Sequence, residues 1–224
     1  SFTVNETVIA TAVTTAQELT NGTAMPDFIP LTNVSGGTGS YTYSIDSANL
    51  PAGLALNTST GTVTGTPTET SSAADMVFQV ADENGSSVSS TVSFTVNAAV
   101  TATADSTAQT LTQDTDMGSF DPFTDELGGT GSYTYSIDSA NLPAGLALNT
   151  STGTVTGTPT VTDVAGVVVE FQVADENGSS VTSTVSFTVS GAVIATAVTT
   201  AQELTKGTAM APFSPLTDVS SGTG

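Results

Sequence analysis

The side chains with the clearest chemical potential in this sequence are acidic, and they recur as pairs. Asp82 and Glu83 precede an Asn-Gly dipeptide, and Asp175 and Glu176 precede a second one. Ca²⁺ binds about six to eight oxygen ligands, many of them carboxylates, so these four residues are calcium candidates. A plain hairpin turn explains the same residues, because Asn-Gly favours the positive φ angles of a tight hairpin. The turn is the favoured interpretation.

A further acidic group lies between the two pairs. Asp114 and Asp116 begin a segment that resembles a calcium loop, but Gly118 stands where such a loop needs its third side-chain ligand. In the first part of the chain, the counterparts of the two acids are Gly22 and Ala24. A solvated acidic loop is therefore the favoured prediction. The sequence requires no cofactor, and calcium is the one that it admits.

Seven Asn-X-Ser/Thr sequons could carry N-linked glycans in a secreted protein. The asparagines concerned are Asn5, Asn21, Asn33, Asn57, Asn84, Asn149 and Asn177. The chain is rich in Ser and Thr and repeats itself, so part of this number arises by chance.

The residue types that are missing exclude most other chemistry. There is no Cys, His or Arg, and Lys206 is the single basic residue against 21 acids. Disulfides, thiolate nucleophiles and imidazole bases are thereby excluded. The net charge of −20 disfavours nucleic acids and anionic membranes. No apolar run approaches the ~20 residues of a membrane helix. The sequence predicts that the chain is not an enzyme, binds no nucleic acid and does not insert into a membrane.

Internal repetition is the strongest signal in the chain. The block GGTGSYTYSIDSANLPAGLALNTSTGTVTGTPT occupies residues 36–68 and recurs unchanged, 92 residues later, at 128–160. The segment FQVADENGSSV starts at Phe78 and again at Phe171, 93 residues later, because one residue is inserted between the blocks. A longer period lies over this one, since VIATAVTTAQELT occupies residues 8–20 and returns at 193–205. Neighbouring units thus differ in their first third, while alternate units match.

Each unit has the pattern of β-structure. Residues 41–45, 76–80 and 88–96 alternate apolar and polar side chains, as half-buried strands do. No segment combines helical periodicity with helix caps. Roughly seven short strands in each unit fit an immunoglobulin-like sandwich. We therefore expect an all-β fold of tandem immunoglobulin-like, or cadherin-like, β-sandwich domains.

Four motifs of each unit, taken together, resemble a known kind of repeat. They are GG-x-G-x-Y-x-Y-x-I at residues 36–45 and 128–137, LPAGL-x-L at 50–56 and 142–148, STG-x-V-x-GTPT at 59–68 and 151–160, and an acidic hairpin with an aromatic strand at 81–96 and 174–189. The set is similar to the Putative Ig and dystroglycan-type cadherin-like repeats of bacterial and archaeal surface adhesins and fibres. The resemblance implies an extracellular location at a cell surface. The linkers at 96–99 and 190–191 hold no carboxylate, which departs from the cadherin calcium pattern.

The predicted organisation follows the repeats. Residues 1–4 are expected to close a preceding repeat, 5–96 and 97–189 to form two complete repeats, and 190–224 to open a further one. The sequence therefore predicts a window on a longer array that acts as a structural filament, stalk or adhesin shaft. Its expected partners are neighbouring repeats and copies of itself. The alternatives are a cell-surface ligand- or glycan-binding module, with residues 21–35 and 113–127 as contact loops, and a phage fibre decoration domain.

Overall fold

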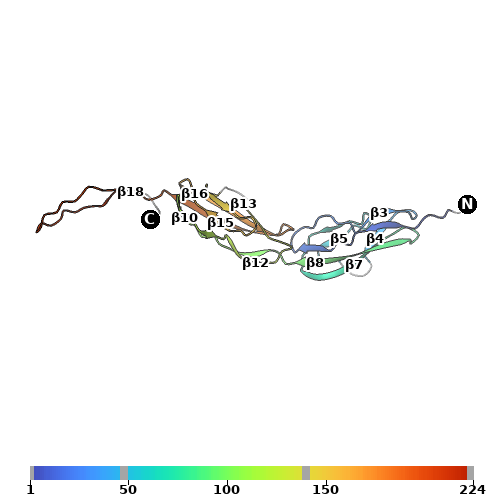
Figure 1. Ribbon diagram of the computed structural model, residues 1–224. Helices are drawn as coiled ribbons and strands as arrows, with labels where there is room; N and C mark the ends of the chain where they lie inside the picture. Colours follow the sequence, from blue (N-terminus) through green and yellow to red (C-terminus); the bar gives the residue numbers. More distant parts are fainter. Residues whose placement is uncertain (1–2, 46–49, 138–141, 221–224) are drawn as a thin grey trace. The chain divides into compact units, whose positions relative to one another are not determined.

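The protein folds entirely as β-structure in the parts that the computed structural model describes, which are residues 3–45, 50–137 and 142–220 (Figure 1). No helix in these ranges is long and apolar enough to cross a membrane. The contacts divide the chain into two compact units. The first joins residues 1–103 with 125–134 and 174–181, and the second holds 104–124, 135–173 and 182–224.

The first unit is built around a four-stranded sheet and smaller two-stranded sheets. Its strands are β1 (Ile9–Ala12), β2 (Gln17–Thr20), β3 (Leu31–Ser35), β4 (Thr42–Ile45), β5 (Leu54–Leu56), β6 (Val63–Gly65), β7 (Ser71–Ala81) and β8 (Ser87–Asn97). The large sheet has the order β2-β8-β7-β4, and the smaller ones pair β1 with β3 and β5 with β6. An isolated bridge between Phe28 and Val63 joins the loop before β3 to β6.

The long hairpin of β7 and β8 is the framework of this unit. The two strands pair antiparallel, with Met76 opposite Val92 and Val80 opposite Val88. Over residues 76–80 of β7 and 90–96 of β8 every second side chain is buried, because successive side chains of a strand point to opposite faces of the sheet. β2 pairs in parallel with the end of β8, so that Leu19 lies opposite Val96. This pairing places the end of β2 beside Val96 and Asn97, where the first repeat ends.

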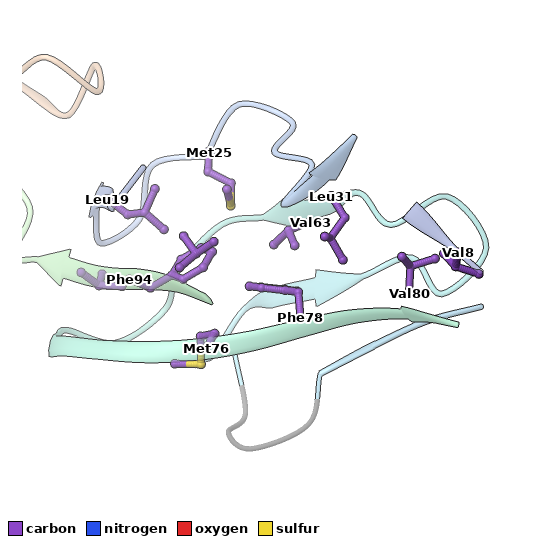
Figure 2. Close-up of a cluster of buried hydrophobic side chains, with 11 residues drawn as sticks. Val8, Leu19, Met25, Leu31, Val63, Met76, Phe78, Val80 and Phe94 are labelled. Carbon is purple, nitrogen blue, oxygen red and sulfur yellow. The ribbon is translucent and has the colours of Figure 1, made fainter. Parts of the chain in front are cut away.

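The core of the unit lies between the β7–β8 hairpin and the smaller sheets (Figure 2). Phe78 and Phe94 are 1% and 0% exposed, and their ring centroids are 6.1 Å apart. Phe28 packs edge-on against Phe94, with centroids 6.0 Å apart and planes at 81°. Leu31 and Val63 close the core from the other side. Aliphatic and aromatic packing therefore takes the place of the disulfide and tryptophan of antibody domains.

The second unit contains most of the second repeat. The strands that follow β8 are β9 (Thr101–Ala104), β10 (Gln109–Thr112), β11 (Ser119–Phe120), β12 (Phe123–Leu127), β13 (Thr134–Ile137), β14 (Leu146–Leu148), β15 (Val155–Gly157), β16 (Asp163–Ala174), β17 (Ser180–Ser190), β18 (Ile194–Ala197) and β19 (Leu216–Ser220). The sheets have the orders β10-β17-β16-β13 and β11-β15-β14, with two-stranded pairs β12-β9 and β18-β19. Phe171 and Phe187 repeat the ring contact of the first core, with centroids 6.2 Å apart.

The residue inserted into the second repeat is accommodated in β16. This strand has 12 residues where β7 has 11. Within β16, Gly166 adopts a φ of +79°, and its amide donates to the Asp163 carboxylate at 3.0 Å. The insertion therefore falls before the FQVADENG segment, and Phe171 keeps the buried position that Phe78 has in the first repeat. The all-β, immunoglobulin-like fold predicted from the sequence is confirmed.

Candidate functional site at the acidic hairpins

The acidic segment of each repeat is the connection between its two longest strands. Five residues, 82–86, separate β7 from β8, and the Asp82 amide donates to the Ser86 carbonyl at 2.9 Å. Gly85 adopts a positive φ of 85°, whereas Asn84 does not. The expectation that Asn-Gly would supply the positive φ angles of a tight hairpin is therefore wrong for the asparagine. The longer loop needs only one left-handed residue, and the Asp82 side chain organises the rest.

The Asp82 carboxylate is a nearly buried acceptor for backbone amides. It is 9% exposed, and its Oδ1 accepts from the amides of Asn84 at 3.0 Å and Ser86 at 2.7 Å. Its Oδ2 accepts from the Thr38 amide at 2.8 Å. Thr38 belongs to the Gly-Gly-Thr-Gly loop between β3 and β4, so one carboxylate joins this loop to the hairpin. The hydrogen bonds offset the cost of burying a charge without a basic partner.

Asp175 repeats this arrangement in the second repeat and is 5% exposed. Its Oδ1 accepts from the amides of Asn177 at 3.1 Å and Ser179 at 2.7 Å. Its Oδ2 accepts from the Thr130 amide at 2.9 Å. Residues 125–134 and 174–181, which carry all these groups, belong to the first compact unit.

Asp175 differs from Asp82 because the end of β2 also reaches it. The Thr20 hydroxyl donates to Asp175 Oδ2 at 2.6 Å, and Thr20 is only 1% exposed. The Asn177 side-chain amide donates to the Glu18 carbonyl at 2.9 Å and lies 3.2 Å from the Thr20 hydroxyl. A strand end of the first repeat is therefore held by the hairpin of the second. We call this set of contacts, made by residues 18–20 with Thr130, Asp175 and Asn177, the β2 joint.

Thr130 adds a polar centre to the β2 joint. Its hydroxyl lies 2.8 Å from the Thr20 hydroxyl and 3.2 Å from the Leu19 carbonyl, and it accepts from the Asn97 side chain at 3.0 Å. A hydroxyl has one hydrogen, so Thr130 donates either to Thr20 or to Leu19 at any moment. The threonine and the strand end thus share a small hydrogen-bonded network.

The network also determines the acidity of Asp175. Burial alone would raise the pKa of this carboxyl group, but the hydrogen bonds from Thr20, from Thr130 and from the hairpin amides outweigh it and lower the pKa below its usual value. The group therefore stays ionised at neutral pH without a basic neighbour. Its negative charge strengthens each hydrogen bond that it accepts.

The calcium candidates are not brought together as a metal centre within the described ranges. Glu83 and Glu176 are exposed, and each accepts from the amide of the serine that follows the Gly-Gly-Thr-Gly segment of its own repeat. Asp114 and Asp116 are exposed, and Asp116 accepts from the Gly118 amide at 3.0 Å. No group of three or more acidic side chains that could hold a metal ion occurs in the described residues. Calcium binding stays a prediction.

The sequon asparagines lie at or near the surface. Asn5, Asn33, Asn57, Asn84 and Asn149 are exposed, and Asn21 and Asn177 are partly buried. The side-chain nitrogen of Asn177, which would carry a glycan, is the atom that donates to Glu18. Glycosylation at that position would therefore remove a contact of the β2 joint, and glycosylation at all seven positions stays a prediction.

The aromatic residues of the variable stretches do not form an exposed cluster. Phe120 and Phe123 are 9% and 4% exposed, and Phe28 is partly buried. Phe120 packs edge-on against Phe187, with centroids 6.3 Å apart. These rings are therefore used in the cores.

Comparison with known proteins assigns the fold to a family. The described strands form tandem immunoglobulin-like sandwiches, and the model of the Putative Ig domain family matches residues 3–99 and 97–190. The chain belongs to this family. The predicted repeat boundaries stay predictions, because the compact units are divided differently.

Solved structures of tandem domains are similar to the chain at low identity. The I67–I69 fragment of titin is 13% identical, with a TM-score of 0.47, over 83% of this chain and 66% of that one. Domains 3–5 of Drosophila OTK are 12% identical, with a TM-score of 0.45, over 82% and 62%. Cadherin domains 3–6 of protocadherin gamma B2 are 16% identical, with a TM-score of 0.34, over 82% and 51%. The chain thus spans about two thirds of these structures or less. No curated protein gives a significant match.

Proposed function

We propose that the chain is a structural segment of an extracellular filament, stalk or adhesin shaft at a cell surface. The β2 joint is the observation that carries the proposal. A free module has no need to bury a threonine of one repeat against an aspartate of the next, but a shaft needs consecutive repeats to hold one another. Thr20 is 1% exposed at this position, and its hydroxyl donates to Asp175 at 2.6 Å.

The mechanism is mechanical. A charge-assisted hydrogen bond resists separation of the strand end from the hairpin, and the Asn177 contact with the Glu18 carbonyl adds a second point of attachment. Two points of attachment oppose rotation of the strand end against the hairpin as well as their separation. Under this proposal the chain is not an enzyme, and its partners are neighbouring repeats and further copies of itself.

The surface composition supports an extracellular shaft. Charged residues make up 10% of the chain, and the net charge is −20. A large net charge of one sign keeps proteins apart in solution, so close contact must come from specific surfaces. The absence of cysteine means that rigidity in an oxidising environment rests on packing and hydrogen bonds.

Electron microscopy of the native material, with and without EDTA, tests the proposal. Long thin fibres with a repeat that matches one or two domains would support it, and loss of stiffness on chelation would add calcium to the mechanism. Short isolated particles under both conditions would contradict it. Glycan-array binding by such particles would favour the ligand-binding alternative, for which the buried Phe120 and Phe123 give no support.

A further inference from the structure

Asn177 is both a donor of the β2 joint and the first residue of an Asn-Gly dipeptide. Its side-chain nitrogen donates to the Glu18 carbonyl at 2.9 Å and lies 3.2 Å from the Thr20 hydroxyl. The same nitrogen is lost as ammonia when an asparagine deamidates, and asparagine is among the thermolabile residues of proteins. Gly178 follows, and it has no side chain to shield its backbone nitrogen or to restrict its backbone. Steric resistance to the reaction is therefore small at this dipeptide.

The reaction needs only the chain and water. The Gly178 backbone nitrogen attacks the side-chain carbonyl carbon of Asn177, and the bond from this carbon to the side-chain nitrogen breaks. The proton of the glycine amide leaves with that nitrogen as ammonia. Water then opens the five-membered imide ring at either carbonyl carbon and gives aspartate or isoaspartate. Water is consumed, ammonia is released, and nothing is oxidised or reduced.

The folded hairpin opposes this reaction at both reacting groups. The Gly178 amide donates to the Asp175 carbonyl at 3.2 Å, which holds the nucleophile in a hydrogen bond. The ring closes only when the Asn177 side chain turns toward the Gly178 nitrogen, and its contacts with Glu18 and Thr20 resist this rotation. Ring closure therefore requires that the strand end first separates from the hairpin.

The product cannot replace Asn177 in the β2 joint. A carboxylate accepts hydrogen bonds and donates none, so the Glu18 carbonyl would face a second acceptor in place of its donor. The new negative charge also lies two residues from Asp175, which is 5% exposed. Isoaspartate further lengthens the backbone of a five-residue loop, 175–179, whose amides at Asn177 and Ser179 donate to Asp175. Each change acts against closure of the joint.

We propose that Asn177 is a site of spontaneous deamidation, that the β2 joint slows the reaction, and that the product opens the joint. A joint that has reacted does not close again, because its donor has left as ammonia. Deamidation thereby converts a transient separation of the strand end into a permanent one. The contacts involved all lie within one chain, so the reaction does not depend on fibre formation by the proposed shaft.

Mass spectrometry of aged chains tests the protection of Asn177. The natural chain and Thr20→Val are incubated at mildly alkaline pH and then cleaved after glutamate. Residues 177–203 form one peptide of this digest, and Asn177 is its only asparagine. The fraction of this peptide that carries aspartate or isoaspartate is followed with time. We expect Thr20→Val to deamidate about tenfold faster, which corresponds to the loss of about 1.4 kcal/mol from the joint.

Two control variants separate the β2 joint from general stability. Thr64→Val alters an exposed threonine and is expected to deamidate at the natural rate. Val63→Ala removes buried atoms from the core and lowers stability without removing a contact of the joint, so we expect it to accelerate the reaction less than Thr20→Val. Equal acceleration by these two variants would overturn the proposal. A natural chain that reacts as fast as the same chain unfolded in guanidinium chloride would overturn it too.

Hydrogen exchange tests the effect of the product. The deamidated chain carries an additional negative charge, so anion exchange separates it from the chain that has not reacted. We expect residues 17–20, which form β2, to exchange about tenfold faster in the deamidated chain and in Asn177→Asp, because an opened strand end loses its protection. Residues 76–80 of β7 are the internal reference and are expected to keep their protection. Unchanged exchange at residues 17–20 would show that the product leaves the joint closed, contrary to the proposal.

Discussion

Asp175 shows how a buried carboxylate is stabilised in a chain that has almost no cations. It accepts hydrogen bonds from the Thr20 hydroxyl and from the amides of Thr130, Asn177 and Ser179. Hydrogen bonds to a charged group each contribute about 1.5–3 kcal/mol. At the residue scale, the threonine hydroxyl is the one of these donors that comes from the first repeat, and it can be removed without altering the hairpin.

Replacement of Thr20 by valine tests this contact. Valine keeps the shape of threonine but removes the hydroxyl, so Asp175 loses a donor while it remains buried. We expect Thr20→Val to lower the free energy of unfolding by about 1.5–3 kcal/mol. Urea unfolding followed by circular dichroism measures the change.

The matched control for Thr20→Val is Thr64→Val, which alters an exposed threonine of β6. We expect it to change stability by less than about 0.5 kcal/mol, as surface substitutions usually do. Equal effects of the two substitutions would show that the hydrogen bond from Thr20 to Asp175 does not contribute to the free energy of unfolding.

The lowered pKa of Asp175 predicts a dependence on pH. Because the folded-state pKa lies below the unfolded value of about 3.9, the stabilisation is present above that value and is lost as the pH falls through the folded-state pKa. We expect the difference in unfolding free energy between the natural chain and Asp175→Asn to be constant near neutral pH and to shrink below about pH 4. A difference that stays the same at low pH would contradict the assignment.

At the scale of elements, alternation of side chains predicted the strands well. Residues 76–80 and 88–96, expected as half-buried strands, fall in β7 and β8, and Phe78 and Phe94 form the core. Such patterns are local, because a strand with one buried face must alternate. The β-sandwich could therefore be predicted from the sequence alone.

The β2 joint could not be predicted in this way. Thr20 and Asp175 are 155 residues apart, and nothing local in either segment marks the other as its partner. The hairpins at Asp82 and Asp175 also have the same sequence, so nothing in the hairpin itself indicates Thr20 as a partner of Asp175. The acidic pairs suggested calcium, whereas the described geometry turns Asp82 and Asp175 toward backbone amides. One signal in the sequence could have indicated the β2 joint. Thr20 ends the segment VIATAVTTAQELT, which recurs at residues 193–205.

The contact of the Gly-Gly-Thr-Gly loop with the hairpin gives a prediction at the element scale. Gly129 has a φ of +73°, and a Cβ added to it would lie 2.8 Å from the Asp175 Cβ and 2.9 Å from a methyl group of Val100. Gly129→Ala must therefore move the loop away from Asp175. We expect a loss of about 2–4 kcal/mol, from steric overlap and an unfavourable φ together.

Gly178→Ala provides the matched control for this substitution. Gly178 has a φ of +90°, but a Cβ at this position meets nothing within 4 Å. The control therefore carries only the backbone cost of about 1 kcal/mol. Thermal unfolding of both variants measures the difference, and equal melting temperatures would show that the loop does not pack closely on the hairpin.

At the scale of the whole molecule, electrostatic repulsion between the acidic side chains lowers the stability of the folded chain. Twenty-one acids and one lysine give a net charge of −20, so ion pairs can offset very little of the repulsion. Repulsion between exposed charges is screened by salt, over a distance of about 10 Å at 0.1 M ionic strength. We therefore expect NaCl to raise the melting temperature, in contrast to proteins that are held by surface salt bridges.

Melting temperatures measured with added CaCl₂ and MgCl₂ distinguish charge screening from binding at a specific calcium site. Calcium and magnesium screen equally at equal ionic strength, but a protein site of flexible carboxylates favours calcium. Asp82 and Asp175 each accept three amide hydrogen bonds, shared between both oxygens, which leaves few acceptor positions for a cation. We therefore expect CaCl₂ and MgCl₂ to raise the melting temperature by the same amount, and EDTA to have no effect in NaCl. A rise specific to calcium that disappears in Asp82→Asn would place a cation at the hairpin, and one that disappears in Asp114→Asn would place it in the acidic loop. Either result would mean that a bound calcium ion, and not charge screening alone, stabilises the fold.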